Sequence, residues 1–468
     1  MQALPATGAH EASLTAVEAQ VLDGARAAVA VASREGGALL RVHGLLAVDD
    51  PWALLGADVG VAMDDPWSGL CFVGFGEEAA GHLDGVLGSC SQRREQVVEV
   101  GSEAAGAPAA AVALPFDATS LAGEWEGWAP VARVPSTVAW RRGEERGLVA
   151  QVWVRPGERP ADVAARAAAG LERLSRRTAG ASWAREVGAA CPGLLARSSE
   201  PREEWCARVE RALHAISAGA LRKVVPARAV RLLPPLGFRF DPSATLDALR
   251  RRNPGALCFG VGGPGGWFLG ASPELLLRRD GDRVESRPLA GTAARGSDPE
   301  RDGELARALL ESAKERREHR MVVDALAAAL APLCEDLRVA PPGVAHLPTM
   351  LHLETRITGR SQAPLLDLLA RMHPTPAVGG WPREEALAWL RREEPVARGL
   401  FAGPVGWAAP GEATFALGIR AALVRPDEAL AWAGAGVVRG SDPEAEWRET
   451  HLKLGVIREA LCARRSRP

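Results

Sequence analysis

The sequence predicts an α+β fold in which large antiparallel sheets are flanked by helices. Short strand-like runs succeed one another at residues 259–262, 267–270, 274–277 and 284–287. The turn signals GGPGG and RDGD lie among these runs, which is typical of antiparallel hairpins. Long helical patterns accompany the strands, and this combination favours α+β architecture over a doubly wound parallel sheet.

Residues 1–197 form an N-terminal part in which short strands mix with helices rich in Ala and Arg. Strands are predicted at Cys71–Phe75 and Leu148–Val154, and a helix at 160–178. No flexible linker or long low-complexity segment separates this part from residues 198–468, so we expect a single structural domain.

The C-terminal part begins with a helix at about 201–218, which leads into the apolar run KVVPARAV at Lys223. Further strands are expected near 415–424 and 429–433, beyond the hairpins described above.

The hexapeptide RGSDPE occurs twice, at 295–300 and 439–444. Each copy supplies an Asp N-cap, a Pro at the first helical position and a Glu in the first turn. We therefore predict helices from about Pro299 to Leu330 and from about Pro443 to Cys462. Shared capping chemistry explains the repeat, which is too short to indicate a duplication.

The charge balance and the cysteines limit the classes of partner. The chain has 56 basic and 58 acidic residues and a net charge of -2, without a basic stripe for nucleic acid or for a membrane surface. A small-molecule partner is expected instead. Seven cysteines occur singly, with no Cys-x-x-Cys, which suits a reducing compartment and argues against a disulfide framework or a zinc–thiolate site.

The N-terminus, MQALPATGAHEASL, lacks the basic and apolar regions of a secretory signal. The Ala-rich stretch 104–114 is interrupted by Pro108 and is far shorter than the roughly 20 apolar residues of a membrane span. We therefore expect a cytoplasmic protein without a membrane anchor.

Only three lysines occur among the 56 basic residues, at Lys223, Lys314 and Lys453. Arginine cannot act as a base near neutral pH, whereas burial can lower the pKa of a lysine by several units. The lysines are therefore the first candidates for proton chemistry, although an Arg-rich chain can also retain lysines without a role. The chain has no tyrosine, which excludes a phenolic acid or base.

The two helices that follow RGSDPE carry carboxylates on faces that become apolar one turn later. Glu318 precedes Val322 on the first helix, and Glu446 and Glu449 precede Val456 on the second. Spacing alone is also compatible with a solvated charged face. If the two faces meet, their oxygens form a site suited to Mg²⁺, completed by water and a substrate carboxylate.

The segment AGAG at 433–436 follows an apolar strand and precedes the second acidic helix. It lacks the third glycine of a dinucleotide fingerprint, so it is either a tight turn or a place where backbone N–H groups approach an anion. Arg420, after the strand predicted at Thr414–Ile419, is suited to a bidentate hydrogen-bonded contact with a carboxylate.

Taken together, these segments resemble the chorismate-utilising enzymes, and isochorismate synthases in particular, over roughly residues 198–462. The resemblance rests on eight motifs in order: KVVPAR (223–228), GASPELLL (270–277), PLAGT (288–292), SAKERREHRMVV (312–323), HPTPAVGG (373–380), IR (419–420), AGAGVV (433–438) and SDPEAEWRETHLK (441–453).

The resemblance implies a fold like that of anthranilate synthase component I and an Mg²⁺-dependent isomerase that adds water at C2 of chorismate and expels the C4 hydroxyl. It assigns Lys223 as general base and Glu274 as general acid. It also implies metal ligands and substrate contacts. The metal ligands would be Glu318 and Glu449, with Glu446 beside them or bound through water. The substrate carboxylates would contact Arg420, Gly434 and Lys453, and Thr292, His352 and Ala377 would line the pocket.

Two positions separate this chain from other members of the family. Anthranilate synthases have Gln at the position of Lys223, and aminodeoxychorismate synthases typically have Lys in the loop where Ala290 stands here. Water is therefore the expected nucleophile, and no glutamine amidotransferase subunit is expected. The downstream pathway, whether menaquinone, a catechol siderophore or salicylate, stays open.

Two alternatives remain. A salicylate synthase has the same Lys and Glu and then eliminates pyruvate, although HPTPAVGG is the form found in isochorismate synthases. A chorismate-binding protein without activity predicts loss of Lys223 or Glu274, and both are present. Pro226 departs from the Leu of many relatives, and the sequence gives no reason for it.

Overall fold

The computed structural model describes residues 8–35, 38–44, 49–55, 59–76, 79–80, 97–100, 107–117, 119–179 and 193–462. The first residues of the chain and two of the cysteines, Cys90 and Cys191, lie outside this part. Cys71, Cys206, Cys258 and Cys334 are free thiols. None of the described helices combines the length and the hydropathy that a bilayer crossing requires.

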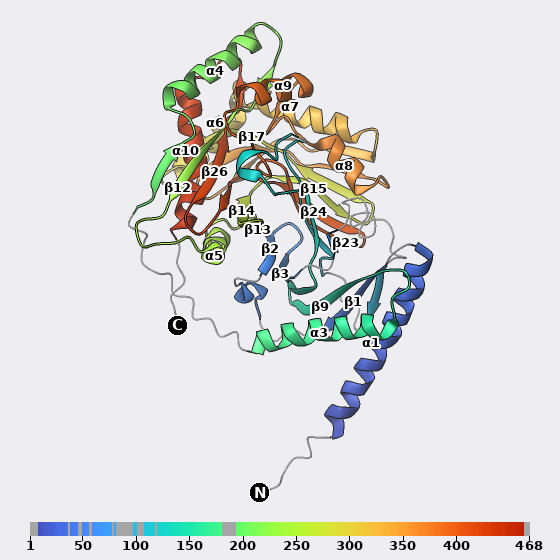
Figure 1. Cartoon of the computed structure of the whole chain (residues 1–468). Coiled ribbons are helices and arrows are strands. Elements are labelled where there is room, and N and C mark those ends of the chain that lie inside the picture. The colour runs from blue at the N-terminus through green and yellow to red at the C-terminus, as the bar shows by residue number, and fades with distance from the viewer. Residues whose placement is uncertain are drawn as a thin grey trace.

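The largest sheet has twelve strands within the described residues, and Figure 1 shows it running through the molecule. All its recorded strand pairs are antiparallel except β1–β5. In spatial order the strands are β10 (Leu195–Ser198), β12 (Ala227–Leu233), β26 (Ala429–Gly434), β25 (Ala421–Val424), β14 (Gly266–Ser272), β13 (Leu257–Gly263), β2 (Val59–Asp65), β3 (Leu70–Phe75), β8 (Thr137–Arg142), β9 (Glu145–Val154), β1 (Ala38–Gly44) and β5 (Val97–Val100).

A second, antiparallel sheet and two small sheets complete the β-structure of the described residues. The second sheet contains β18 (Glu335–Val339), β21 (Ile357–Arg360), β16 (Arg283–Arg287), β15 (Leu275–Asp280), β24 (Glu412–Leu417), β23 (Pro404–Ala409), β6 (Ala110–Ala113), β7 (Val131–Val134) and β4 (Ala79–Ala80). One small sheet contains β22 (Gly380–Trp381), β11 (Lys223–Val224) and β27 (Val437–Val438), and the other β17 (Leu289–Ala294), β20 (Met350–Glu354) and β19 (Gly343–His346). Each large sheet contains strands that precede residue 198 in the sequence and strands that follow it.

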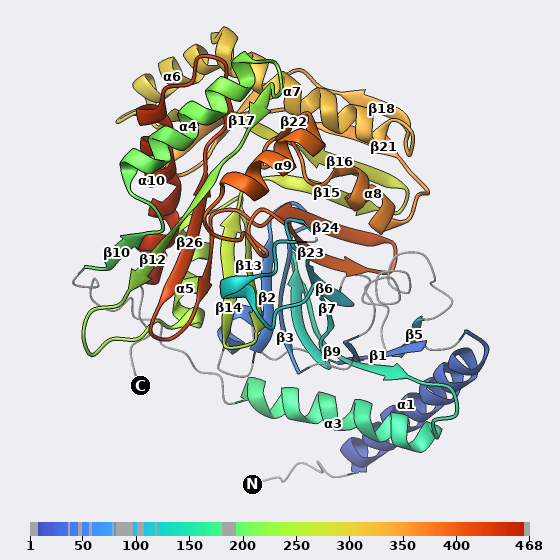
Figure 2. The ribbon, with the colours of Figure 1, turned by 45° about the horizontal axis from the view of Figure 1, so that its top comes forward.

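Helices flank these sheets, as expected for the α+β class. They are α1 (Gly8–Glu35), α3 (Pro160–Ala179), α4 (Arg202–Ser217), α5 (Pro242–Arg252), α6 (Pro299–Glu311), α7 (Ala313–Leu330), α8 (Leu365–Met372), α9 (Arg383–Glu393) and α10 (Pro443–Leu461), with short 3₁₀ turns η1 (Pro51–Leu54) and η3 (Gly123–Trp125). Figure 2 shows α1 and α3 against β1 and β9, far from the end of the sheet at which α4 and α10 lie.

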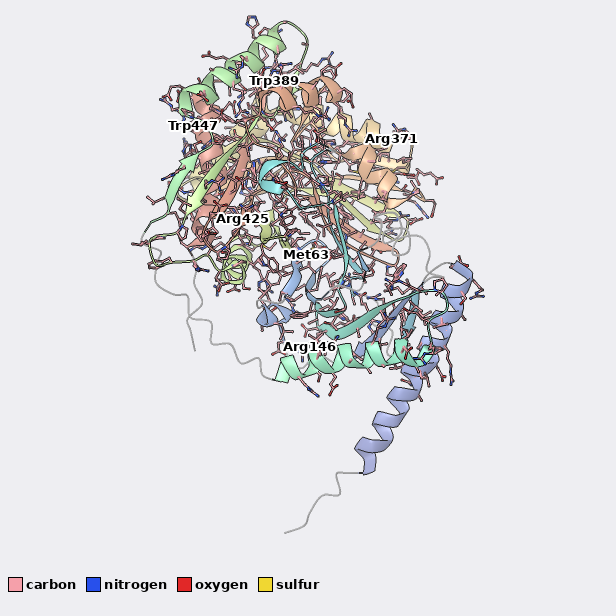
Figure 3. All side chains as sticks on the ribbon, viewed as in Figure 1. Met63, Arg146, Arg371, Trp389, Arg425 and Trp447 are labelled. Atoms are coloured by element: carbon pink, nitrogen blue, oxygen red, sulfur yellow. The ribbon has the colours of Figure 1, made fainter. Side chains whose placement is uncertain are left out.

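The alternation of side chains along each strand divides the core into layers. Met63 and Phe259 point into the apolar cluster shared by the two large sheets, whereas their neighbours Ala62 and Cys258 belong to the cluster under α5 and α10. Met63 lies near the centre of the molecule in Figure 3 and is fully buried. The twelve-stranded sheet is therefore covered on both faces.

Both helix starts predicted from RGSDPE are confirmed. The side chains of Asp298 and Asp442 accept backbone N–H groups from Arg301 and Ala445, and the helices begin at Pro299 and Pro443.

The prediction of one helix from Pro299 to Leu330 was wrong. The helix ends at Glu311, and a new one begins after Ser312, whose hydroxyl accepts the N–H of Glu315. A serine side chain that caps a backbone N–H competes with helix continuation. The resulting break gives α7 a start of its own.

The strand structure expected near 415–424 is not continuous. It is two strands, β24 and β25, which belong to different large sheets. The chain crosses between the sheets at 418–420, where Arg420 has a φ of 52°. Left-handed backbone at a residue other than glycine costs about 1–2 kcal/mol, so surrounding contacts must hold Arg420 in place.

The side chain of Trp125 should be the main anchor of the N-terminal part in the core. It is fully buried, stacks on Trp432 at 5.3 Å between ring centroids and meets Phe268 edge-on at 5.6 Å. We expect Trp125→Ala to lower the free energy of unfolding by about 3–5 kcal/mol, which guanidinium denaturation measures. Leu236→Ala is the control, because Leu236 is fully exposed. Equal midpoints for the two variants would contradict this role.

Candidate active site

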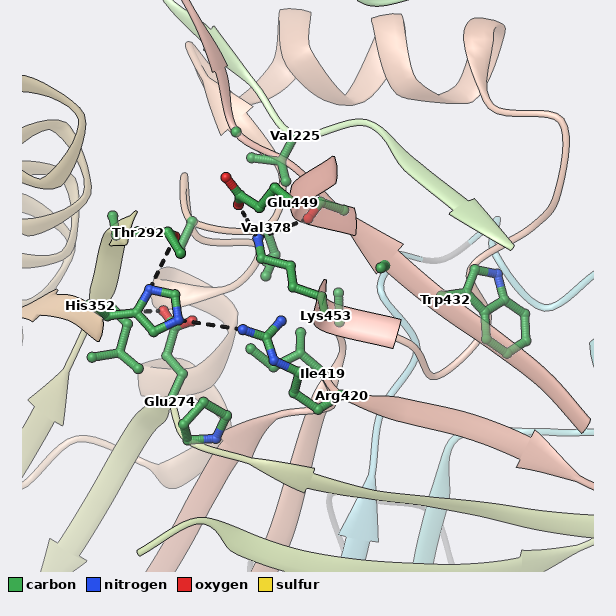
Figure 4. Close-up of a pocket in the computed structure, with 18 of the residues that line it drawn as sticks. Val225, Glu274, Thr292, His352, Val378, Ile419, Arg420, Trp432, Glu449 and Lys453 are labelled. Atoms are coloured by element: carbon green, nitrogen blue, oxygen red, sulfur yellow. Dashed lines mark hydrogen bonds and ion pairs between the residues drawn. The ribbon is translucent and has the colours of Figure 1, made fainter. Parts of the chain in front are cut away.

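One pocket brings together residues that are far apart in the sequence. Ten of the eleven site residues predicted from the sequence line it: Lys223, Glu274, Thr292, Glu318, His352, Ala377, Arg420, Gly434, Glu449 and Lys453. The eleventh, Glu446, is buried on the same helix as Glu449 but does not line the pocket. Figure 4 shows several of these side chains converging from helix, strand and loop.

Lys223 enters the pocket from β11, a strand of two residues held between β22 and β27. Its side chain is 1% exposed, and its Nζ lies 2.9 Å from Oε1 of Glu318 on α7. Gly436 makes room for this pair, since a Cβ at Gly436 would lie 2.5 Å from that oxygen and 3.2 Å from Cε of Lys223. The second glycine of AGAG is therefore required by close approach.

Pro226 stands where the chain leaves the small sheet and enters β12. Val225 still donates its N–H to Gly379, and the carbonyl of Pro226 accepts the N–H of Ala435. A residue at this crossing needs no N–H of its own, so proline costs no hydrogen bond here. The position therefore accommodates a proline, and nothing in the structure explains why it replaces leucine.

Glu274, which precedes β15, has a carboxyl group suited to donating a proton. It is buried, and burial raises its pKa to about 7, although the N–H of Leu289 and the charges of Lys223, Lys453 and Arg420 act in the opposite direction. A carboxyl group with this pKa is substantially protonated at neutral pH.

Arg420 contributes a buried cation to the pocket lining. Its Nη2 contacts Sδ of Met350 at 2.9 Å and Nε2 of His352 at 3.4 Å, and no ion pair with a carboxylate is recorded for it among the described residues. Burial, together with the charges of Arg420 and Lys453, lowers the pKa of His352 to about 3, so the imidazole is neutral. His352 Nδ1 lies 3.2 Å from the hydroxyl of Thr292 (Figure 4).

Four carboxylates from α7 and α10 repel one another beside the pocket. Burial and the charge of Glu449 raise the pKa of Glu446 to about 7, and burial with Glu318 and Glu449 raises the pKa of Glu315. Burial alone would raise the pKa of Glu449, but Lys453, at 2.6 Å, holds it below its ordinary value. Lys453 also donates to the carbonyl of Gly434.

These carboxylates offer only oxygen donors, which is the ligand set that Mg²⁺ prefers. Their mutual repulsion would be relieved by a divalent cation, so the residues fit the ion implied by the resemblance. As they stand, no three acidic, His or Cys side chains of the described residues are gathered as a metal site. Glu318 and Glu449 are each paired with a lysine.

Comparison with known families agrees with this geometry. A model of the family described as chorismate binding enzyme matches residues 65–462. The chain belongs to this family of chorismate-binding enzymes. It is 39% identical over 330 residues to the salicylate biosynthesis isochorismate synthase of Pseudomonas aeruginosa, across 69% of this chain and 67% of that protein.

Solved structures of chorismate-binding enzymes share the fold. The menaquinone-specific isochorismate synthase MenF of Escherichia coli has a TM-score of 0.76 at 25% identity and covers 96% of this chain and 100% of its own. Anthranilate synthase component I of Streptococcus pneumoniae has a TM-score of 0.64 at 22% identity, covering 86% and 93%. The predicted α+β fold and the resemblance to isochorismate synthases are confirmed, and the family match begins well before residue 198.

Several residues in or beside the pocket were missed in the sequence. Glu315 lies one turn before Glu318, a spacing that places both on one helix face and could have indicated it. Gly436 belongs to the same AGAG segment as Gly434. Arg398 and Trp432 also line the pocket, and no local pattern distinguishes them from the other arginines and core aromatics.

The raised pKa of Glu274 predicts how stability depends on pH. A carboxyl whose pKa is raised on folding favours the fold while protonated, and that contribution is lost as pH rises through about 7. Glu274→Gln cannot ionise, so its Tm relative to the unmodified protein should increase from about pH 5 to about pH 8.5. Each unit of pKa shift corresponds to about 1.4 kcal/mol in the free energy of unfolding. Differential scanning calorimetry across this range measures the difference, and a flat difference would contradict a buried, raised pKa.

Proposed function

We propose that the protein is an isochorismate synthase, which isomerises chorismate to isochorismate by adding water at C2 and releasing the C4 hydroxyl as water. The observation that carries the proposal is that an amine, Lys223, and a carboxyl whose pKa is raised to about 7, Glu274, face one pocket. The relative from Pseudomonas aeruginosa described above, itself named an isochorismate synthase, supports it.

In this proposal Lys223 and Glu274 divide the proton transfers. Once its amine no longer pairs with Glu318, Lys223 accepts a proton from the attacking water at Nζ, and protonated Glu274 gives its proton to the departing C4 hydroxyl. The lysine favours water over ammonia, and Ala290, at the pocket wall, has no group that could form a covalent adduct. The reaction therefore needs no ammonia-supplying amidotransferase subunit.

Binding of the substrate is assigned to the remaining polar groups. Chorismate carries two carboxylates, and the guanidinium of Arg420, with Lys453 and Gly434 nearby, suits one of them. Glu318 and Glu449 would hold Mg²⁺, with Glu446 and Glu315 adjacent. The ion would neutralise these carboxylates and would supply positive charge for the second carboxylate of the substrate. Glu318 and Glu449 must then exchange their lysine partners for the ion.

The test of the function is incubation with chorismate and Mg²⁺, followed by chromatographic separation of isochorismate, salicylate, anthranilate and pyruvate. Isochorismate as the main product supports the proposal. Anthranilate in the presence of ammonium, or unchanged chorismate, would overturn it.

Lys223→Ala should lose at least about 10²-fold in kcat while chorismate still binds, because only the base is removed. Lys223→Arg should be almost as damaging, since a guanidinium cannot deprotonate water. Steady-state kinetics together with calorimetric binding of chorismate separate the two effects. A kcat near that of the unmodified enzyme in either variant would show that Lys223 is not the general base.

Chelation should abolish turnover, and added Mg²⁺ should restore it. Glu318→Gln should need a much higher Mg²⁺ concentration for half-maximal activity, because one charged ligand is lost. Glu311→Gln, at an exposed position before the break at Ser312, is the matched control and should keep its Mg²⁺ dependence. Activity that persists in EDTA contradicts the metal site.

Proton transfer by Lys223 and Glu274 is reversible, so the enzyme should also convert isochorismate to chorismate. It should yield no more than traces of pyruvate, because pyruvate release needs a further hydrogen shift from C2. A lactate-dehydrogenase-coupled assay measures this product. Stoichiometric pyruvate without ammonium would instead identify a salicylate synthase with the same residue roles.

A further inference from the structure

A buried ion pair between Arg398 and Glu394 lies beside the pocket. The side chains are 3% and 8% exposed, and Glu394 caps the C-terminal end of α9. Nε of Arg398 donates to Glu394 at 2.8 Å, and its guanidinium lies 4.2 Å from the ring centroid of Phe116 in the N-terminal part. Arg398 also lines the pocket.

The same guanidinium holds two backbone segments that form the pocket wall. Nη2 donates to the carbonyl of Val225 at 2.6 Å, and Nη1 donates to the carbonyl of Val378 at 2.7 Å. Oε1 of Glu394 accepts the N–H of Ala227 at 2.7 Å. The ion pair therefore holds the chain on both sides of Pro226.

This segment needs such support because its own secondary structure is short. Lys223 lies in a strand of only two residues, and the chain changes sheets at Pro226, which has no N–H to donate. Near Lys223, the backbone is bound by Arg398 at Val225 and by Glu394 at Ala227. A shift at Val225 would be transmitted directly to Lys223, two residues away.

We infer that Arg398 and Glu394 are positioning residues for the Lys223 amine. The inference rests on the proposed function only in what the amine does, not in how it is held. Arg398 is not a substrate clamp, because four of its five N–H donors already bond to Glu394, Val225 and Val378. Arg420, by contrast, has no ion pair recorded among the described residues.

The test compares Arg398→Met with Arg208→Met. Arg208 and Glu200 form an equally buried pair, 1% and 4% exposed, that does not line the pocket. Both variants should lose stability. Only Arg398→Met should lower kcat for chorismate, by about 10- to 100-fold, with KM within about threefold, since a 1 Å displacement of a reacting group can cost about 10²-fold. Arg398→Lys keeps the charge but not both carbonyl contacts, so its kcat should lie between those of Arg398→Met and the unmodified enzyme. This variant tests the inference if Arg398→Met does not fold.

Hydrogen exchange gives a readout that does not depend on the reaction. Amides of residues 222–228 should exchange faster in Arg398→Met and stay unchanged in Arg208→Met. If the unmodified enzyme does not convert chorismate, the proposed function fails, and exchange alone still decides the positioning role. Equal exchange in the two variants, an equal loss of kcat in both, or a rise in KM with unchanged kcat would overturn it.

Discussion

The ion pair between Lys223 and Glu318 is the contact on which the arrangement of the pocket depends. Removing an ammonium group from water costs several kcal/mol unless a partner compensates, and Lys223 is almost completely buried. Glu318 can be that partner because α7 starts afresh at Ser312, and Gly436 leaves space for both side chains. Strand β11, helix α7 and the loop after β26 must therefore come together before Lys223 can be buried.

Burial then shifts the pKa values of several groups of the pocket in different directions. It raises the pKa of Glu274, whose compensating charges lie farther away, and lowers that of His352, which faces cations. Glu449 keeps its charge because Lys453 is in contact with it. One pocket thus contains a proton donor, a neutral imidazole and an ionised carboxylate, and the neighbours of each group rather than its residue type decide which it is.

Local signals in the sequence predicted the local features well. The starts of α6 and α10 follow from capping within four residues, and the hairpin β13–β14 follows from its glycine-rich turn. The prediction that failed, a continuous helix through Ser312, and the interruption of the strand structure at Arg420 concern places where favourable local periodicity is overridden. At Ser312 a side-chain cap competes with the helix, and at Arg420 the chain must pass from one large sheet to the other.

The sequence by itself determined which residues are candidates for the chemistry, because three lysines and eight ordered motifs single out the proposed acid, the proposed base and the carboxylates. Only the tertiary structure decided how they are held. Arg398 binds the carbonyl of Val225 from 173 positions away, and Gly436 is needed because Glu318 approaches it from another helix. Such contacts leave no periodic trace in the chain, since they follow from which surfaces pack together rather than from the conformational preferences of neighbouring residues.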